Sequence, residues 1–156
     1  MKYVIYVLFC LLILSCKDKK PDCCVIIDTT IDIEFRDSIG RDLLNQSQSY
    51  AYKFSDMQHL YLDKNNSKKV VYVGNLDYPK EMLIYKDVDS IPATLKISPH
   101  IETYEHGLRN FTDYIQLSST DEDTIQTQIE ITNSTRVIKF VKYNGQNVGR
   151  YIIITK

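Results

Sequence analysis

The densest group of metal-ligating side chains in the sequence lies between Ser98-Pro99 and Gly107. His100, Glu102 and His106 supply imidazole nitrogens and carboxylate oxygens, the donors that zinc and other divalent metals accept. On a strand these three side chains would share one face, because alternate residues point to the same side. The flanking proline and glycine favour a loop, in which polar side chains are solvated. We therefore predict no metal or other cofactor, and keep these three residues as the one metal candidate.

The sequence contains no recognisable catalytic pattern. It has no Gly-x-Ser-x-Gly elbow, no glycine-rich phosphate loop and no histidine at a familiar spacing from a nucleophile. His59 alternates with Leu60 and Leu62, which predicts a position on the polar face of a strand. The acids at 121–123 lack the spaced ligands of a calcium loop and predict a solvated turn. We expect a non-catalytic binding or structural module; the alternative is an enzyme with a loop-built site, since such sites are recognised by geometry.

A second alternative is a carbohydrate-binding module. Tyrosine rings can stack on sugar rings, although the sequence has no tryptophan and strand tyrosines are mostly packing residues. The tyrosines considered for this role are Tyr50, Tyr52, Tyr61, Tyr72 and Tyr114. The expected partner is an unknown protein or glycan, because a formal charge of -1 gives no indication of nucleic acid binding.

The amino terminus has the features of an export signal. Met1-Lys2 is a basic start, residues 3–14 are apolar, and the small residue Ser15 follows. The apolar stretch falls short of the about 20 residues that a membrane-spanning helix needs, which argues against an uncleaved anchor. We predict a cleaved signal peptide over residues 1–15, a tether over 16–22 and one domain over 23–156.

The segment Ile13-Leu14-Ser15-Cys16 resembles the lipobox of bacterial lipoproteins. The resemblance implies cleavage before Cys16, fatty acylation of its thiol with chains such as palmitate, and usually acylation of the new amino terminus. Two or three acyl chains give stable membrane anchoring. Cys23 and Cys24 then remain, and we expect two small apolar residues that open the first strand; the alternative is an intermolecular disulfide or a thiol-linked partner.

Composition and periodicity predict an all-β fold. Isoleucine, valine, threonine and twelve tyrosines are abundant, and no stretch has helical periodicity. Asn144-Gly145 predicts a type I′ hairpin, because both turn positions need a positive φ. We predict a single antiparallel β-sandwich, immunoglobulin-like or related, of about 8 strands. The expected strands cover residues 31–35, 60–62, 70–73, 82–85, 94–97, 111–117, 125–132, 135–143 and 148–155.

The lipobox, residues 31–45 and the segment Lys142-Tyr143-Asn144-Gly145 are together similar to small lipoproteins of Bacteroidota. The shared motifs are turn and hairpin residues, so the resemblance implies a fold and a compartment but no activity and no functional residues. Lys17 stands where an aspartate would favour retention at the inner membrane, which implies the outer membrane. Among residues 17–20 only Asp18 is acidic, and this favours the periplasmic face over the cell surface.

Four segments resemble the acidic-hydroxyl sequon that Bacteroidota use for O-glycosylation in the periplasm. The candidate acceptors, each preceded by an aspartate, are Thr29, Ser38, Ser90 and Thr124. This pattern predicts a glycoprotein; the alternative is ordinary turn chemistry, in which aspartate is often followed by serine or threonine. We expect Ser38, Ser90 and Thr124 in or beside surface turns, and Thr29 is the acceptor that could face the core.

Overall fold

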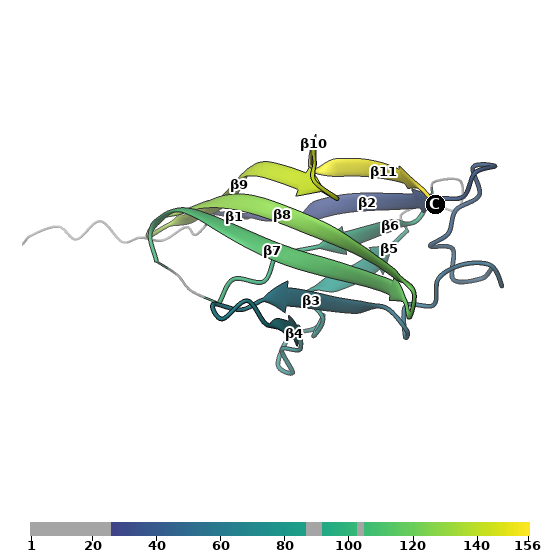
Figure 1. The fold of residues 1–156 in the computed structure, drawn as a ribbon, viewed down its shortest axis with the longest axis horizontal. Helices are drawn as coiled ribbons and strands as arrows, with labels where there is room; N and C mark the ends of the chain where they lie inside the picture. Colours follow the sequence, from purple (N-terminus) through teal and green to yellow (C-terminus); the bar gives the residue numbers. More distant parts are fainter. Residues whose placement is uncertain (1–25, 87–91, 103–104) are drawn as a thin grey trace, which may run out of the picture.

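The computed structural model describes residues 26–86, 92–102 and 105–156, and every regular element in these ranges is a β-strand (Figure 1). No helix in this part of the chain is long and apolar enough to cross a membrane. Cys16, Cys23, Cys24 and Ser90 lie outside the described residues. The strands are β1 (Ile26–Asp28), β2 (Ile31–Arg36), β3 (Gln58–Leu62), β4 (Lys68–Val70), β5 (Met82–Tyr85), β6 (Thr94–Ile97), β7 (Gly107–Ser118), β8 (Asp121–Ile131), β9 (Thr135–Tyr143), β10 (Gln146–Val148) and β11 (Tyr151–Thr155).

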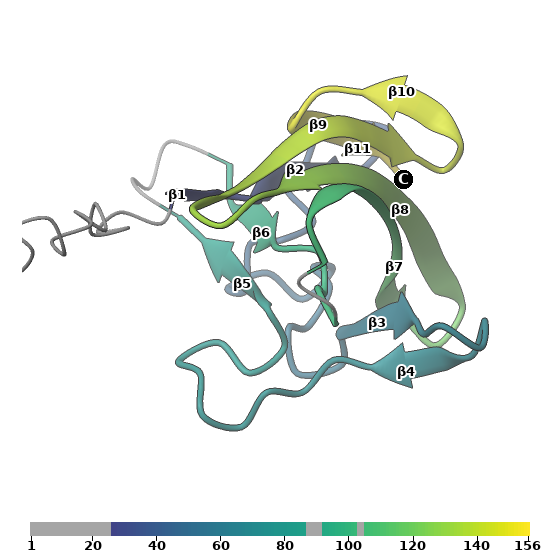
Figure 2. The same ribbon diagram turned by 90° about the vertical axis from the view of Figure 1, so that its left-hand side faces the viewer.

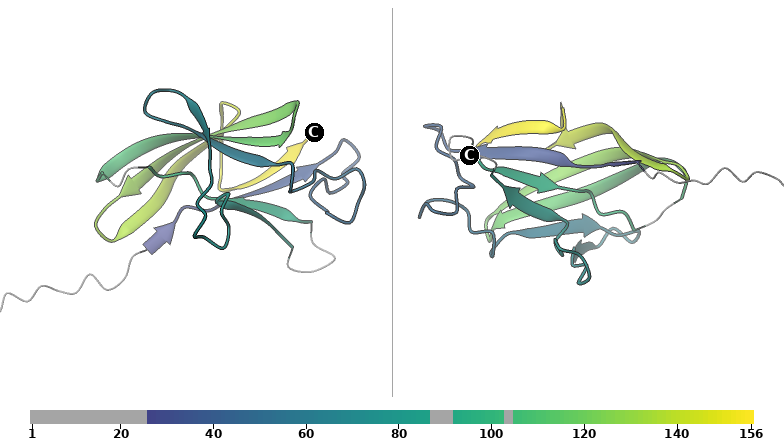
Figure 3. Two further views of the ribbon diagram at one scale, coloured as in Figure 1. Left: turned by 90° about the horizontal axis from the view of Figure 1, so that it is seen from below. Right: turned by 180° about the vertical axis from the view of Figure 1, so that it is seen from behind.

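The strands form two sheets. The larger, here called sheet A, has the order β1-β9-β8-β7-β3-β4, and β10 also pairs with β9. Sheet B has the order β11-β2-β6-β5. Figure 2 shows β9, β8 and β7 curving over the interior towards β3, and Figure 3 shows both layers from below and from behind. The all-β prediction is confirmed, and the two layers are consistent with a β-sandwich.

The core lies between the inner faces of the two sheets. Ile31, Ile33 and Phe35 alternate along β2 and have no exposed surface. They belong to one apolar cluster with Ile115 of β7 and Ile125 of β8. The period-2 pattern therefore directs these residues inward, as the sequence predicts.

The prediction that all strand pairs are antiparallel was wrong, because both sheets are mixed. β1 runs parallel to β9, and β11 runs parallel to β2. The expected strand at 148–155 is broken: the chain pairs as β10 in sheet A, passes Gly149-Arg150 and continues as β11 in sheet B. Since β11 then lies beside a strand from the start of the described chain, long-range packing rather than a hairpin sets its direction.

Two predicted turns are confirmed. Asn144 and Gly145 have φ values of 46° and 81°, as a type I′ turn requires, and they join β9 to β10. In the turn after β2, Gly40 has a φ of 84° and Asp37 Oδ1 accepts the backbone N–H of Arg41 at 2.8 Å.

Candidate functional site

A groove of about 340 Å³ lies where the β3–β4 hairpin faces β7 and the segment that leads from β6 to β7. β3 contributes Tyr61, β7 contributes Asn110 and Thr112, and the connecting segment contributes His100 and Glu102. The complete lining is Tyr61, Leu62, Asp63, Lys64, Asn66, His100, Glu102, Asn110, Phe111 and Thr112. The groove therefore combines aromatic rings with many hydrogen-bonding groups.

His100 is held on both its ring and its backbone. Its Nδ1 lies 2.7 Å from Glu81 Oε2, and its backbone N–H donates to Asp113 Oδ1 at 3.0 Å. Its ring centroid is 4.2 Å from that of Tyr61. The hydrogen bond with Glu81 raises the pKa of His100 above its ordinary value, although burial opposes this. These contacts fix the position of His100, which forms one side of the groove.

Behind His100 lies a buried pair of side chains, His59 and Asp113, which are 0 % and 1 % exposed. His59 Nε2 is 2.9 Å from Asp113 Oδ1, and His59 Nδ1 is 2.9 Å from the carbonyl oxygen of Lys80. Both ring nitrogens therefore face oxygen atoms, whereas a neutral imidazole has one donor. Both contacts are hydrogen bonds when the pair shares one further proton, carried by the imidazole or by the carboxyl group.

The prediction that His59 lies on the polar face of its strand was wrong. His59 points inward opposite Ile115, and Leu60 and Leu62 take the outer face of sheet A. Leu60 is only partly buried there, between Val70 of β4 and Tyr114 of β7. The side chains of β3 do alternate between the two faces of the sheet. The face that carries His59 is the inner one, because the His59 ring contacts Asp113 and the carbonyl oxygen of Lys80 there.

The three residues of the metal candidate are only partly together. His100 and Glu102 both line the groove, and a hydrogen bond from Tyr61 to Glu102 raises the pKa of the tyrosine. His106 is exposed, and its carbonyl oxygen accepts a bond from Arg109 Nη2 at 3.2 Å. Among the described residues, no three histidine, cysteine, aspartate or glutamate side chains are grouped as metal ligands would be.

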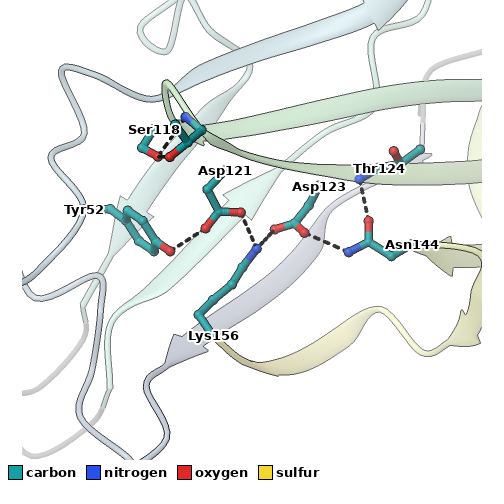
Figure 4. A network of polar contacts seen from close by, with 8 residues as sticks. Tyr52, Ser118, Asp121, Asp123, Thr124, Asn144 and Lys156 are labelled. Atoms are coloured by element: carbon teal, nitrogen blue, oxygen red, sulfur yellow. Dashed lines mark hydrogen bonds and ion pairs between the residues drawn. The ribbon is translucent and has the colours of Figure 1, made fainter.

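A second polar cluster lies at the start of β8, and Figure 4 shows it around Lys156. Lys156 Nζ lies 2.6 Å from both Asp121 Oδ1 and Asp123 Oδ2. The Tyr52 hydroxyl donates to Asp121 Oδ2 at 2.6 Å, and Asn144 Nδ2 donates to Asp123 Oδ1 at 2.7 Å. The acids predicted as a solvated turn are therefore engaged in contacts with three other parts of the chain.

The charges of this cluster stabilise one another. Burial alone would raise the pKa of Asp121, but the hydrogen bonds from Lys156 and Tyr52 leave it below its ordinary value. Burial would likewise lower the pKa of Lys156, and the two aspartates raise it. Burial and the neighbouring Asp123 raise the pKa of Tyr143. Because its charged groups pair with one another, we interpret this cluster as a structural tie and the groove as the candidate site.

The candidate glycosylation residues differ in access. Ser38 is exposed in the turn after β2, and Thr124 is half-buried on the outer face of sheet A, paired with Tyr114. Thr29 is only 5 % exposed and is poorly placed for a transferase. Ser90 and the lipidation residue Cys16 lie outside the described residues.

The tyrosines considered for sugar stacking are equally dispersed. Of the five, Tyr61 alone lines the groove. Tyr52 belongs to the Lys156 cluster, and Tyr72 is 73 % exposed. The rings of Tyr50 and Tyr114 are covered by cations, with Arg41 Cζ at 4.3 Å and Lys68 Nζ at 3.8 Å from the respective centroids.

Sequence reasoning missed Glu81, Asp113 and Asn110. A signal for Asp113 existed, because it shares the parity of Ile115 and Leu117 and so is an acid on the apolar face of its strand. Glu81 gave none, since its φ of 50° and its contact with His100 depend on tertiary structure. Comparison with family models, curated proteins and solved structures finds no match.

Proposed function

We propose that this protein is a non-catalytic binding module, held at the outer membrane by lipid on Cys16, and that the Tyr61–His100 groove receives its ligand. The observation that carries the proposal is the fixed lining: Tyr61 contacts both His100 and Glu102, and the buried Asp113 accepts the backbone N–H of His100 from behind. Such preorganisation lowers the entropy cost of binding a polar ligand.

The lining supports binding better than catalysis. Its carboxylates are engaged: Glu102 bonds Tyr61, and Asp63 Oδ1 accepts the N–H groups of Asn65 and Ser67 at 2.8 Å each. Among the described residues that form the groove there is no serine or cysteine nucleophile. We further propose that the two sheets form a β-sandwich of the immunoglobulin-like or a related type.

The outer membrane, with the periplasmic face favoured, is proposed from the lipobox and from Lys17. Cys16→Ser should leave an uncleaved precursor, because the acylated thiol is the substrate for processing. The wild type should incorporate radioactive palmitate and partition into detergent. Unchanged size and partitioning of the variant would contradict the anchoring.

Ligand binding at the groove can be tested by photo-crosslinking in the native host. A photoreactive amino acid at Lys64, an exposed lining residue, should give discrete adducts in gel and mass analysis. The same amino acid at Ile153, which is 50 % exposed on sheet B, serves as the control. Equal labelling from both positions, or none from Lys64, would refute the groove as the binding site.

A further inference from the structure

Two histidines hold two consecutive residues of the segment that leads from β4 of sheet A into β5 of sheet B. His59 Nδ1 lies 2.9 Å from the carbonyl oxygen of Lys80, and His100 Nδ1 lies 2.7 Å from Glu81 Oε2. Glu81 has a φ of 50°, in the left-handed region that residues other than glycine rarely adopt. Such a conformation persists only where the surrounding contacts impose it. The two histidine contacts are therefore placed to control the conformation of residues 80–81.

The contacts of His59 need one proton more than a neutral histidine and an ionised aspartate possess. The Lys80 carbonyl can only accept, so its bond requires a hydrogen on His59 Nδ1. His59 Nε2 then meets Asp113 Oδ1 at 2.9 Å, which is a hydrogen bond only when the imidazole or the carboxyl group holds the further proton. Asp113 Oδ2 is buried and has no hydrogen-bond partner among the described residues. Loss of the proton would therefore leave a buried, uncompensated negative charge and set two lone pairs against each other.

Acidic groups outnumber basic ones around the two histidines. The titratable and charged groups that face them are Glu81, Asp113, Glu102, Tyr61 and Lys80. All three carboxyl groups raise the pKa of His100, and the hydrogen bond with Glu81 contributes most. Lys80 Nζ donates to the carbonyl oxygens of Met57 and Phe54, at 2.7 and 3.2 Å. The environment of the two histidines is therefore mainly acidic.

We infer that the proton shared by His59 and Asp113 controls the groove. With the proton bound, both ring nitrogens of His59 are bonded, residues 80–81 are held against sheet A, and Glu81 keeps His100 at the side of the groove. When the proton is lost as pH rises, His59 keeps only one of its two contacts, and residues 80–81 are released together with the support of His100. Ligand binding should therefore weaken with increasing pH. This inference rests on the proposed function and names the regulation of the same site.

The sign of the effect follows from the number of protons bound. Above about pH 6.5 an exposed histidine is neutral and an exposed aspartate is ionised, whereas the closed His59–Asp113 pair holds one more proton. Release of the pair therefore gives up a proton. The equilibrium constant for release should rise about tenfold for each further pH unit, until the closed pair itself loses the proton.

Hydrogen exchange measures this release directly. The Glu81 amide donates to the Tyr78 carbonyl at 2.9 Å, and the Ser98 amide donates to the Glu81 carbonyl at 3.0 Å, so both report on residues 80–81. The test uses the full-length acylated protein in detergent micelles between pH 6 and 9, with rates corrected for the base catalysis of exchange itself. We expect protection of both amides to fall by up to about tenfold per pH unit above about pH 6.5.

Two variants assign the slope to the pair. Asp113→Asn replaces the carboxyl group by an amide that does not titrate, so the pH dependence of protection should disappear at whatever stability the variant has. His106→Gln, which removes an exposed histidine from the segment before β7, is the matched control and should keep the wild-type slope. The wild-type slope alone decides whether release is coupled to a proton, so the test stands even if Asp113→Asn does not fold.

Control of the groove is tested with the photoreactive amino acid at Lys64. Cell envelopes of the native host, irradiated at pH 6.5 and at pH 8.5, should give fewer adducts at the higher pH. Protection that does not change with pH, or a slope that Asp113→Asn leaves intact, would overturn the inference. Equal adduct yields at both pH values would also overturn it and would retain the binding module. An absence of adducts at both pH values would refute the proposed function and, with it, the control of the groove.

Discussion

Replacing Lys156 with methionine tests the view that the cluster around Lys156 ties the fold together. Methionine keeps most of the hydrocarbon stem, which brings Lys156 Nζ to 5.8 Å from the Phe35 ring centroid, and removes only the charge. Asp123 and Asp121, with side chains 5 % and 27 % exposed, then lose their cation. Each keeps one hydrogen bond, from Asn144 and Tyr52 respectively.

The expected cost lies between those of a buried and a surface ion pair. Breaking a fully buried pair costs roughly 3–5 kcal/mol, and a surface pair contributes about 0–1 kcal/mol. Because the Lys156 side chain is 19 % exposed, we expect Lys156→Met to lower the free energy of unfolding by about 2 kcal/mol. At about 4 °C per kcal/mol, this corresponds to a melting temperature lower by about 8 °C.

The loss should depend on pH with a defined sign. The pKa of Asp121 is lowered in the folded protein, so its ion pair stabilises the fold above the ordinary carboxyl pKa. That contribution disappears as pH falls through the folded pKa. The difference between wild type and variant should therefore be largest above about pH 5 and shrink below about pH 3.9.

Urea unfolding followed by circular dichroism measures both quantities. Lys139→Met is the matched control, because Lys139 pairs with Glu130 at 2.7 Å with both side chains more than 40 % exposed. We expect this control to change stability by less than about 0.5 kcal/mol. Equal effects of the two substitutions, or a loss at Lys156 that is independent of pH, would refute the reasoning.

Three further predictions concern a turn, a histidine and a modification. Gly145→Val should lower the free energy of unfolding by roughly 1–3 kcal/mol, because Gly145 has a φ of 81°. Gly149 lies outside the left-handed region, so Gly149→Ala should lower the free energy of unfolding by less than about 1 kcal/mol in the same urea assay. Equal losses of stability in the two variants would argue against backbone strain at position 145. Because the pKa of His100 is raised in the folded protein, its protonation should add stability that is fully present below about pH 6.5 and lost as pH rises through the folded pKa. Glu81→Gln should therefore make the melting temperature depend less on pH between pH 5.5 and 8.5. An unchanged pH dependence would assign it to another group. Ser38 is exposed in its turn and should carry a glycan in protein purified from the native host. Intact mass spectrometry should then show an added mass that Ser38→Ala removes. A mass equal to that of the lipidated polypeptide would contradict this prediction.

Local signals in the sequence predict much of the fold. The alternation at 31–35 predicts the buried face of β2, and Asn144-Gly145 predicts the hairpin after β9. Both succeed because a side-chain period and a positive φ are properties of a few neighbouring residues. The parallel pairing of β1 with β9 and of β11 with β2 joins segments more than 100 residues apart, and no short pattern specifies it.

The candidate site was less predictable for the same reason. His100 and Glu102 stood out by residue type, and the structure places both in the groove. Their partners Glu81 and Asp113 come from segments 19 and 13 residues away from His100, and sequence reasoning did not select them. His59 shows how tertiary packing reverses an expectation: the alternation of apolar and polar residues fixes two faces, but partners distant in the chain decide which face is inside.

The parallel pairing of β2 and β11 gives the domain a mechanical property. Five residue pairs, from Tyr151 and Asp32 to Thr155 and Arg36, lie in register along these strands. Because the strands run in the same direction, the start of β2 and the end of β11 lie at opposite ends of the pair (Figure 1). A force that pulls these two points apart loads the hydrogen bonds between the strands together, in shear, and does not open them one after another. Tension between these two points is therefore carried by all the hydrogen bonds of the β2–β11 pair at once.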